Sequence, residues 1–171
     1  MVRMTTSELR ALQGPLKQRY RDDPASALIT LRADGELGSG VSCAVQTAQA
    51  FVRAGLHPGT GGDGLSACSG DMLLQALVAC AGVTLNAVAT SLELSVTGTV
   101  HAEGDLDFRG TLGVDRETPV GFSEIRLRFD LCTDATEEQL ATLTRLTERY
   151  CVVYQTLANP PSLQVTRTAG S

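Results

Sequence analysis

Residues 69–92 read SGDMLLQALVACAGVTLNAVATSL, and this stretch decides the fold. Between Met72 and Val83 the only strongly polar residue is Gln75, and the stretch contains no proline. Leucine, methionine, alanine and glutamine all favour a helix, and the apolar positions run nearly all round it instead of forming one stripe. A helix of this kind is buried on most of its sides. The sequence therefore predicts a long central helix with other elements packed around it.

This central stretch is not predicted to cross a membrane. It is too polar at Gln75 and Asn86, and too rich in alanine, to make a convincing span. Ser69 or Asp71 can cap its start, and a carboxylate at Asp71 is also favoured by the positive end of the helix dipole. Cys80 lies in the middle of the predicted helix.

Composition limits the class of protein. The chain has 171 residues, enough for one substantial core, and a formal net charge of -5 with no block of lysine or arginine. Tryptophan is absent and only 4% of residues are aromatic, so few side chains can stack on bases. We therefore expect no nucleic-acid partner and no membrane partner. The first twenty residues show no signal-peptide pattern, which makes the cytoplasm the expected location.

The five cysteines, at positions 43, 68, 80, 132 and 151, do not have the pattern of a disulfide framework. Their number is odd, their spacing is wide, and a reducing compartment is expected. The sequence has no CxxC motif, and its two histidines, His57 and His101, are in unrelated segments. We therefore expect no metal site.

The rest of the chain predicts an α+β fold with mainly antiparallel sheet. Strands are expected, in chain order, at residues 27–33, 41–52, 94–103, 122–132 and 163–168. The clearest is 122–132, where apolar residues alternate with charged ones, as in a strand of an antiparallel sheet with one buried and one solvated face. Asp34-Gly35 is expected to form the hairpin turn between the first two strands.

Two more helices and one long loop complete the expected order. Residues 5–22 have an amphipathic pattern, so we expect residues 1–26 to be a helical extension and residues 27–171 to be the domain itself. Asp134 or Thr136 caps a last helix that ends near Cys151. The glycine-dense stretch 55–70 is a loop that leads into the central helix, and loops of this length are usually functional or mobile.

The two segments around Cys80 and Cys151 together resemble the osmotically inducible protein C and organic hydroperoxide resistance family (OsmC/Ohr). The first, Asp71-Met-Leu-Leu-Gln-Ala-Leu-Val-Ala-Cys80, is similar to the acidic residue, apolar run and Ala-Cys pair of the family's central helix. The second, Glu148-Arg-Tyr-Cys151-Val-Val-Tyr-Gln-Thr-Leu157, is similar to the family's second-cysteine segment at a helix end. The intervening residues match the family's middle hairpin in order and character, and the resemblance covers roughly residues 27–168.

The resemblance implies both a fold and an activity. The fold is OsmC-like, with antiparallel sheets packed around a long buried central helix in an interwoven homodimer. The activity is a thiol-dependent peroxidase of the oxidative stress response, which reduces an organic hydroperoxide, takes electrons from a dithiol reductant and needs no metal or organic cofactor. Cys80 is then the thiolate that becomes a sulfenic acid, and Cys151 is the resolving thiol that forms a disulfide with it.

A buried cysteine needs a positive charge nearby to be reactive. Burial alone raises the pKa of a thiol, whereas the thiolate is the nucleophile, and the peroxidase branch of the family carries an arginine against this thiolate. Arg53, just before the glycine-dense loop, fits that pattern best, and Arg32 is the competitor. Asp71 is either a helix-capping residue or, by the resemblance, the acid that orients the arginine.

Departures from the family pattern keep other interpretations open. Val152 follows Cys151 where the family often has proline, and the position of the arginine is ambiguous, which indicates an outlying subgroup. Cys80 is in one alternative a core residue, and the protein an OsmC-fold dimer that binds a small molecule with little or no peroxidase activity. In another, Cys80 is the nucleophile of an acyl or thioester hydrolase, which needs a base that neither histidine is placed to supply.

Overall fold

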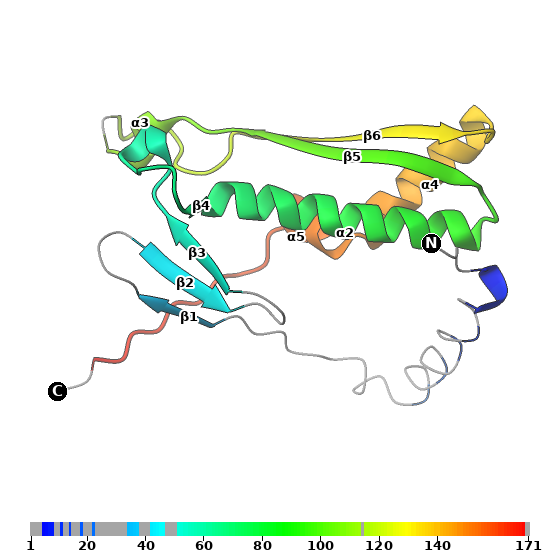
Figure 1. Ribbon diagram of the computed structural model, residues 1–171, viewed down its shortest axis with the longest axis horizontal. Helices are drawn as coiled ribbons and strands as arrows, with labels where there is room; N and C mark the ends of the chain where they lie inside the picture. The colour runs from blue at the N-terminus through cyan, green and yellow to red at the C-terminus, as the bar shows by residue number, and fades with distance from the viewer. Residues whose placement is uncertain are drawn as a thin grey trace.

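The computed structural model describes residues 5–8, 11, 14, 18, 22, 34–37, 42–46, 51–113 and 115–169, and only the backbone of 34–37, 42–46 and 51. Figure 1 shows one long helix, α2 (Ser69–Ser91), running through the middle of the molecule. A two-stranded antiparallel sheet, β5 (Val96–Asp105) and β6 (Glu124–Thr133), lies along α2. A second sheet, in the order β1-β2-β3-β4, lies near the N-terminal end of the helix. The architecture is α+β, as predicted.

Helix α2 confirms the predicted central helix almost residue for residue. The start differs in one respect, because Cys68 occupies the N-cap and no side chain caps the helix, so neither Ser69 nor Asp71 does so. The two residues before the helix, β4 (Ala67–Cys68), are held in a parallel pairing with β3, which carries the chain straight into the first turn. Asp71 remains in that turn, where the helix dipole stabilises a negative charge.

The expected burial of α2 on most sides is wrong for the single chain. The buried residues lie on one face: Leu77, Ala81, Leu85, Val88 and Ala89. That face packs against β5, α4 (Glu137–Tyr150) and α5 (Val152–Ala158). Val83, on another face, has 72% of its surface exposed. By length and composition α2 could cross a membrane, but this packing makes it the core helix of the domain.

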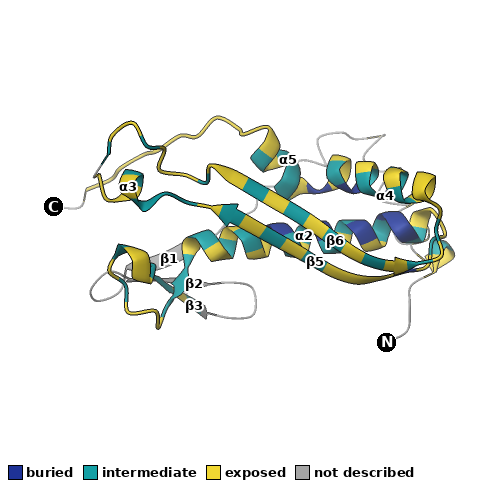
Figure 2. Cartoon of the chain, turned by 90° about the horizontal axis from the view of Figure 1, so that it is seen from above, coloured by how far each residue is buried: buried dark blue, intermediate teal, exposed yellow. Residues whose placement is uncertain are grey.

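Strands β5 and β6 confirm the clearest part of the strand prediction. They pair antiparallel over their whole length, from Val96 opposite Thr133 to Asp105 opposite Glu124. Along β6 half-buried and exposed residues alternate strictly (Figure 2). Its apolar side chains pack against residues of α2, and its charged ones are exposed. Gly98 has a φ of 144°, and a Cβ there would meet the Asp130 carbonyl oxygen at 2.0 Å, so the pairing at this point requires glycine.

Helices α4 and α5 are separated by a single residue, Cys151. Thr136, one of the two predicted caps, begins α4 in a capping box with Gln139. The Cys151 N–H donates to the Thr147 carbonyl at 2.9 Å, and its own carbonyl accepts from the Gln155 N–H at 2.9 Å. Cys151 therefore ends one helix and begins the next, and its backbone is fixed from both sides.

The first sheet corrects two predictions. Asp34-Gly35 does not turn the chain, because both residues lie within β1 (Asp34–Leu37), opposite Gln46 and Val45 of β2 (Ser42–Gln46). The single strand predicted over residues 41–52 is two antiparallel strands, β2 and β3 (Phe51–Gly55). The four residues between them in the sequence, TAQA, include no typical turn former, so the pattern gave no sign of a break. The strand predicted at 27–33 lies outside the described residues.

The loops and the ends of the chain hold the remaining differences. The glycine-dense stretch contains a short 3-10 helix, η2 (Pro58–Thr60), and β4, and a one-turn helix, α3 (Phe108–Thr111), follows β5. The strand predicted at 163–168 is absent, since residues 159–169 are exposed and have no regular secondary structure. Within 5–22 the described residues 6–8, 11, 14, 18 and 22 are helical. Whether residues 1–26 form a separate extension stays a prediction.

Candidate functional site: two cysteines between α2 and α5

The fold brings together the two cysteines singled out from the sequence. Cys80 lies in the middle of α2, and Cys151 at the junction of α4 and α5. Both belong to one apolar cluster with Leu77 and Ala81, closed by the inner faces of β5 and β6. Cys151 is 1% exposed and Cys80 is half-buried, and the two thiols lie close enough for each to shift the pKa of the other. Neither is in a disulfide.

The surroundings of Cys80 favour its thiolate. Burial is the largest single effect and raises the pKa of the thiol, because it disfavours a charge. Four hydrogen-bond donors oppose it: the backbone N–H groups of Val153 and Val152, the Cys151 thiol and the Thr84 hydroxyl. Together they outweigh burial, so the pKa of Cys80 lies below that of an ordinary cysteine. Half-buried and with a lowered pKa, Cys80 has the properties of a nucleophile.

The surroundings of Cys151 have the opposite result. Burial again comes first and raises the pKa of this thiol. The Tyr154 N–H lowers it, but the bond given to Cys80 and the repulsion from a charge on Cys80 both raise it, leaving the pKa of Cys151 above the ordinary value. Of the two thiols, Cys80 is therefore the more readily ionised, and Cys151 is the one that donates the hydrogen bond.

Arg53 and Asp71 both lie toward the N-terminal end of α2. Arg53 is exposed on β3, in the sheet near the start of α2, and it is not among the groups that act most strongly on the Cys80 sulfur. Asp71 is exposed in the first turn of α2, nine residues before Cys80, or about 14 Å along the axis. Arg32 lies outside the described residues. Among the described residues, the groups that act most strongly on Cys80 include backbone amides and two side chains that sequence analysis had not singled out as donors.

The donors that were missed left one signal in the sequence. Val152 stands where the family often has proline, and a proline has no N–H to offer. By the family resemblance, this departure indicates an outlying subgroup. In the structure, the Val152 N–H is a hydrogen-bond donor to Cys80. Thr84, one turn after Cys80, left no signal beyond its spacing of four residues.

Neither histidine lies at the cysteine pair. His57 caps η2, where its Nδ1 accepts from the Gly59 N–H at 3.0 Å, and its ring stacks on Phe108 with 5.1 Å between centroids. His101 is on the solvent face of β5, 3.3 Å from the Asp130 carboxylate. Among the described residues the hydrolase interpretation therefore lacks its base. The described residues also contain no cluster of three or more side chains that could bind a metal ion.

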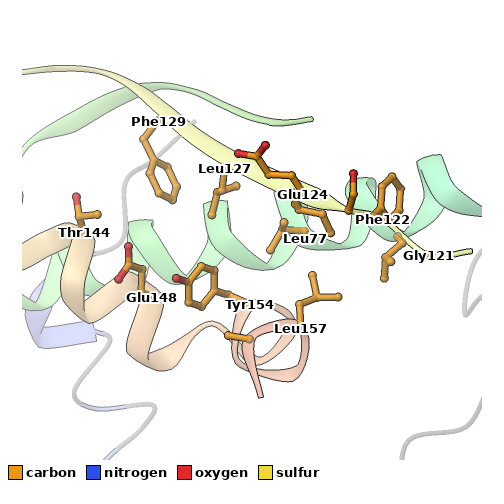
Figure 3. Close-up of a pocket in the computed structure, with 14 residues that line it drawn as sticks. Leu77, Gly121, Phe122, Glu124, Leu127, Phe129, Thr144, Glu148, Tyr154 and Leu157 are labelled. Atoms are coloured by element: carbon orange, nitrogen blue, oxygen red, sulfur yellow. The ribbon is translucent and has the colours of Figure 1, made fainter. Parts of the chain in front are cut away.

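Two grooves are lined by residues that neighbour the cysteines in the sequence or in the apolar cluster. The first lies between α2 and α4, has a volume of about 540 Å³ and includes Val83, Thr84 and Tyr150 in its lining. The second is larger, about 720 Å³, and lies between β6, α2 and the α4–α5 pair. Figure 3 shows its apolar floor and the polar ends of Glu148 and Tyr154 on one side.

Comparison with known proteins identifies the fold. The family model described as "OsmC-like protein" matches residues 61–166, while no curated protein matches the chain. Among solved structures, the OsmC-like protein from Mycoplasma pneumoniae has a TM-score of 0.64 at 17% identity, with 77% of this chain and 89% of that chain covered.

Two further solved structures are similar to the same extent. The organic hydroperoxide resistance protein from Elizabethkingia anophelis has a TM-score of 0.61 at 19% identity, covering 77% of this chain and 91% of that one. An OsmC-like protein of unknown function from Vibrio cholerae has a TM-score of 0.58 at 13% identity, covering 75% and 94%. At these identities the likeness concerns the fold, which confirms the predicted α+β architecture around a central helix.

Proposed function

We propose that this chain, which belongs to the OsmC-like protein family, is a thiol-dependent peroxidase that reduces organic hydroperoxides. The observation that carries the proposal is the pairing of a cysteine of lowered pKa, Cys80, with a buried thiol, Cys151, in direct hydrogen-bond contact. A structural cysteine in an apolar core has no need of four donors around its sulfur. A peroxidatic cysteine does, because they stabilise the thiolate that attacks.

The reaction needs only the two cysteines, a peroxide and a dithiol. The Cys80 thiolate attacks the terminal oxygen of R–O–O–H, the O–O bond breaks, and the products are Cys80 sulfenic acid and an alkoxide, which takes a proton from water. The Cys151 thiol then displaces the hydroxyl of the sulfenic acid, forming the disulfide and one molecule of water. A dithiol reductant exchanges with this disulfide, returning two protein thiols and leaving oxidised.

One experiment tests this sequence directly. The reduced protein is treated with one equivalent of cumene hydroperoxide, alkylated and mapped by peptide mass spectrometry. We expect a Cys80–Cys151 disulfide, with Cys132 still alkylated, because Cys132 is exposed on β6 and away from the pair. A bridge from Cys80 to Cys68, or no bridge with both thiols intact, would contradict the two-cysteine mechanism.

We further propose that the working unit is a cytoplasmic homodimer. The apolar surface of α2 supports this, since Val83 and Leu73 are 72% and 38% exposed on a helix with no polar face to present to water. A second copy would cover that surface and complete the burial expected from the sequence. Sedimentation should show a dimer at micromolar concentration, and a folded, stable monomer there would count against it.

A second function is favoured by one observation, the 720 Å³ groove beside β6. Its apolar lining with few polar groups is the usual composition of a small-molecule site. In this alternative the protein is a binding dimer with little or no peroxidase activity. Steady-state assays with cumene and tert-butyl hydroperoxide and a dithiol donor separate the two functions, because a binding protein leaves both peroxides unconsumed.

A further inference from the structure

Thr84 supplies a hydroxyl that acts on the Cys80 sulfur. It follows Cys80 by one helical turn and is half-buried. Its Oγ1 donates to the Cys80 carbonyl oxygen at 2.8 Å. The same hydroxyl is also within hydrogen-bond reach of the Cys80 sulfur. Two acceptors of one residue, its carbonyl and its sulfur, therefore face a single hydroxyl group.

A threonine hydroxyl carries one hydrogen and so donates one strong bond at a time. While Cys80 is a neutral thiol, the carbonyl oxygen is the better acceptor, because sulfur in a thiol accepts only weakly. Once the thiol ionises the balance changes, since a bond to an anion is roughly twice as strong as one between neutral groups. A rotation about the Cα–Cβ or Cβ–Oγ1 bond is enough to redirect the proton.

We propose, on the basis of the peroxidase function above, that Thr84 is a catalytic residue whose hydroxyl turns from the Cys80 carbonyl to the Cys80 sulfur when the thiolate forms. The donor then stabilises the nucleophile before attack. It returns to the carbonyl when the sulfur becomes neutral as a sulfenic acid. The donor strength at the sulfur thus rises and falls with the charge on it.

The position of Thr84 in the α2–α4 groove supports this role. Thr84 lines that groove beside apolar neighbours such as Val83, Ala87 and Leu146. The other hydroxyl that α2 contributes to the lining, Ser91, bonds the Ala87 carbonyl at 3.0 Å, two turns further from Cys80. A hydroperoxide with an apolar body that enters this groove meets the Thr84 hydroxyl, one helical turn from Cys80.

The same helix contains a matched control. Thr90 donates to the Asn86 carbonyl at 2.8 Å, the same local bond over the same spacing, but the residue at its acceptor has no sulfur. Such bonds back to the preceding turn contribute little to helix stability. Replacing Thr90 removes the ordinary bond alone, whereas replacing Thr84 removes that bond and the donor to the sulfur.

The test compares Thr84→Val, Thr84→Ser and Thr90→Val with the wild type. The first readout is the pH profile of Cys80 alkylation by iodoacetamide, followed on the Cys80 peptide, and the second is the rate with cumene hydroperoxide. We expect Thr84→Val to move the alkylation midpoint to higher pH and to slow both reactions at neutral pH by about three- to tenfold, the effect of losing one typical hydrogen bond. Thr84→Ser should have a midpoint and rates close to those of the wild type, and Thr90→Val should have the wild-type midpoint and rates.

Two results would overturn the proposal. One is a Thr84→Val protein with the wild-type midpoint and rate. The other is a Thr84→Ser protein as slow as Thr84→Val, which would make side-chain shape, and not the hydroxyl, the cause. If Thr84→Val does not fold by circular dichroism, Thr84→Ala removes the same donor. Alkylation needs no peroxide, so it decides the role of Thr84 even if the wild type consumes none and the proposed function fails.

Discussion

Cys80 and Cys151 lie in one cluster, yet the groups around them shift the pKa of the two thiols in opposite directions. Burial raises the pKa of both thiols. At Cys80 the N–H groups of Val152 and Val153 and two further donors reverse this effect. At Cys151 the Tyr154 and Val153 N–H groups lower the pKa, but burial, the bond that it gives to Cys80 and the repulsion from a charge on Cys80 outweigh them. Burial and two backbone amides act on both thiols, so the direction of the hydrogen bond between the thiols, together with the Thr84 hydroxyl, distinguishes the two.

This difference supports the proposed roles, with Cys80 as the attacking thiol and Cys151 as the resolving thiol. The hydrogen bond that Cys151 gives lowers the pKa of Cys80 and raises its own. The groups that act most strongly on Cys80 include backbone N–H groups of α5, so part of the stabilisation of a thiolate comes from the backbone itself.

The largest effect is expected from replacing the attacking thiol. Cys80→Ser should abolish hydroperoxide consumption, because a serine hydroxyl is not ionised at neutral pH and cannot form a sulfenic acid. Peroxide loss in the presence of a dithiol measures this. Cys132→Ser, on the exposed end of β6, is the control and should keep the wild-type rate. Residual consumption by Cys80→Ser would place the reactive thiol elsewhere.

Replacing the resolving thiol should separate attack from turnover. A serine at 151 still offers a hydroxyl donor to the Cys80 sulfur, so the first reaction with peroxide should remain within about threefold of the wild-type rate. Turnover should stop after that reaction, because no disulfide can form, and Cys80 should proceed to the sulfinic acid. Intact-mass spectrometry should show an addition of two oxygen atoms. Full turnover in Cys151→Ser would mean that another thiol resolves the sulfenic acid.

The sequence predicted the parts of this site that depend on local pattern. The unbroken apolar run placed Cys80 within a helix, and the strict alternation around Ile125 to Leu131 gave β6 and its buried face. Asp134 and Thr136 marked the start of the helix that ends near Cys151, and Thr136 is the residue that caps it. The pairing of the two cysteines came from family resemblance, because a separation of 71 positions carries no geometric information by itself.

The donors to Cys80 could not be predicted, and the reason is physical. Backbone N–H groups have no residue identity, so which of them point at a sulfur is known only once the break between α4 and α5 is placed to the residue. The search for a cation led instead to Arg53, since side-chain charge is what a sequence displays. The prediction of a single strand over residues 41–52 was wrong for a similar reason. No typical turn residue separates β2 from β3 in the sequence.

A smaller effect is expected from removing one backbone donor. Val152→Pro deletes the N–H at the first position of α5, where proline is well tolerated, and Cys151 already has the extended backbone (φ −73°, ψ 109°) that proline requires of its predecessor. The pKa of Cys80 should rise, and alkylation at neutral pH should slow by about fivefold. Val152→Ala keeps the N–H and serves as the control. Equal rates in the two variants would show that this amide does not stabilise the thiolate.

The smallest effect is expected at Arg53, and its dependence on concentration is what makes it informative. Within the chain the groups that act most strongly on the Cys80 sulfur do not include Arg53. If this arginine contributes, as the family resemblance predicts, we expect it to do so from a second copy. Arg53→Ala should then slow Cys80 alkylation by about two- to threefold, a modest share for a partly solvated charge, at concentrations where the dimer forms. The effect should vanish on dilution to the monomer.

Arg128→Ala is the matched control, because Arg128 is an exposed arginine of β6 paired with Asp130 at 3.1 Å on the solvent face of the sheet. It should leave alkylation unchanged at every concentration. A slowing of Arg53→Ala that persists on dilution would mean that the arginine acts within its own chain. No slowing at any concentration would transfer the role to Arg32, and an equal lack of effect in Arg32→Ala would leave the α5 amides, Cys151 and Thr84 as the groups that lower the pKa of Cys80. Sedimentation of the same samples fixes the concentration at which each outcome is judged.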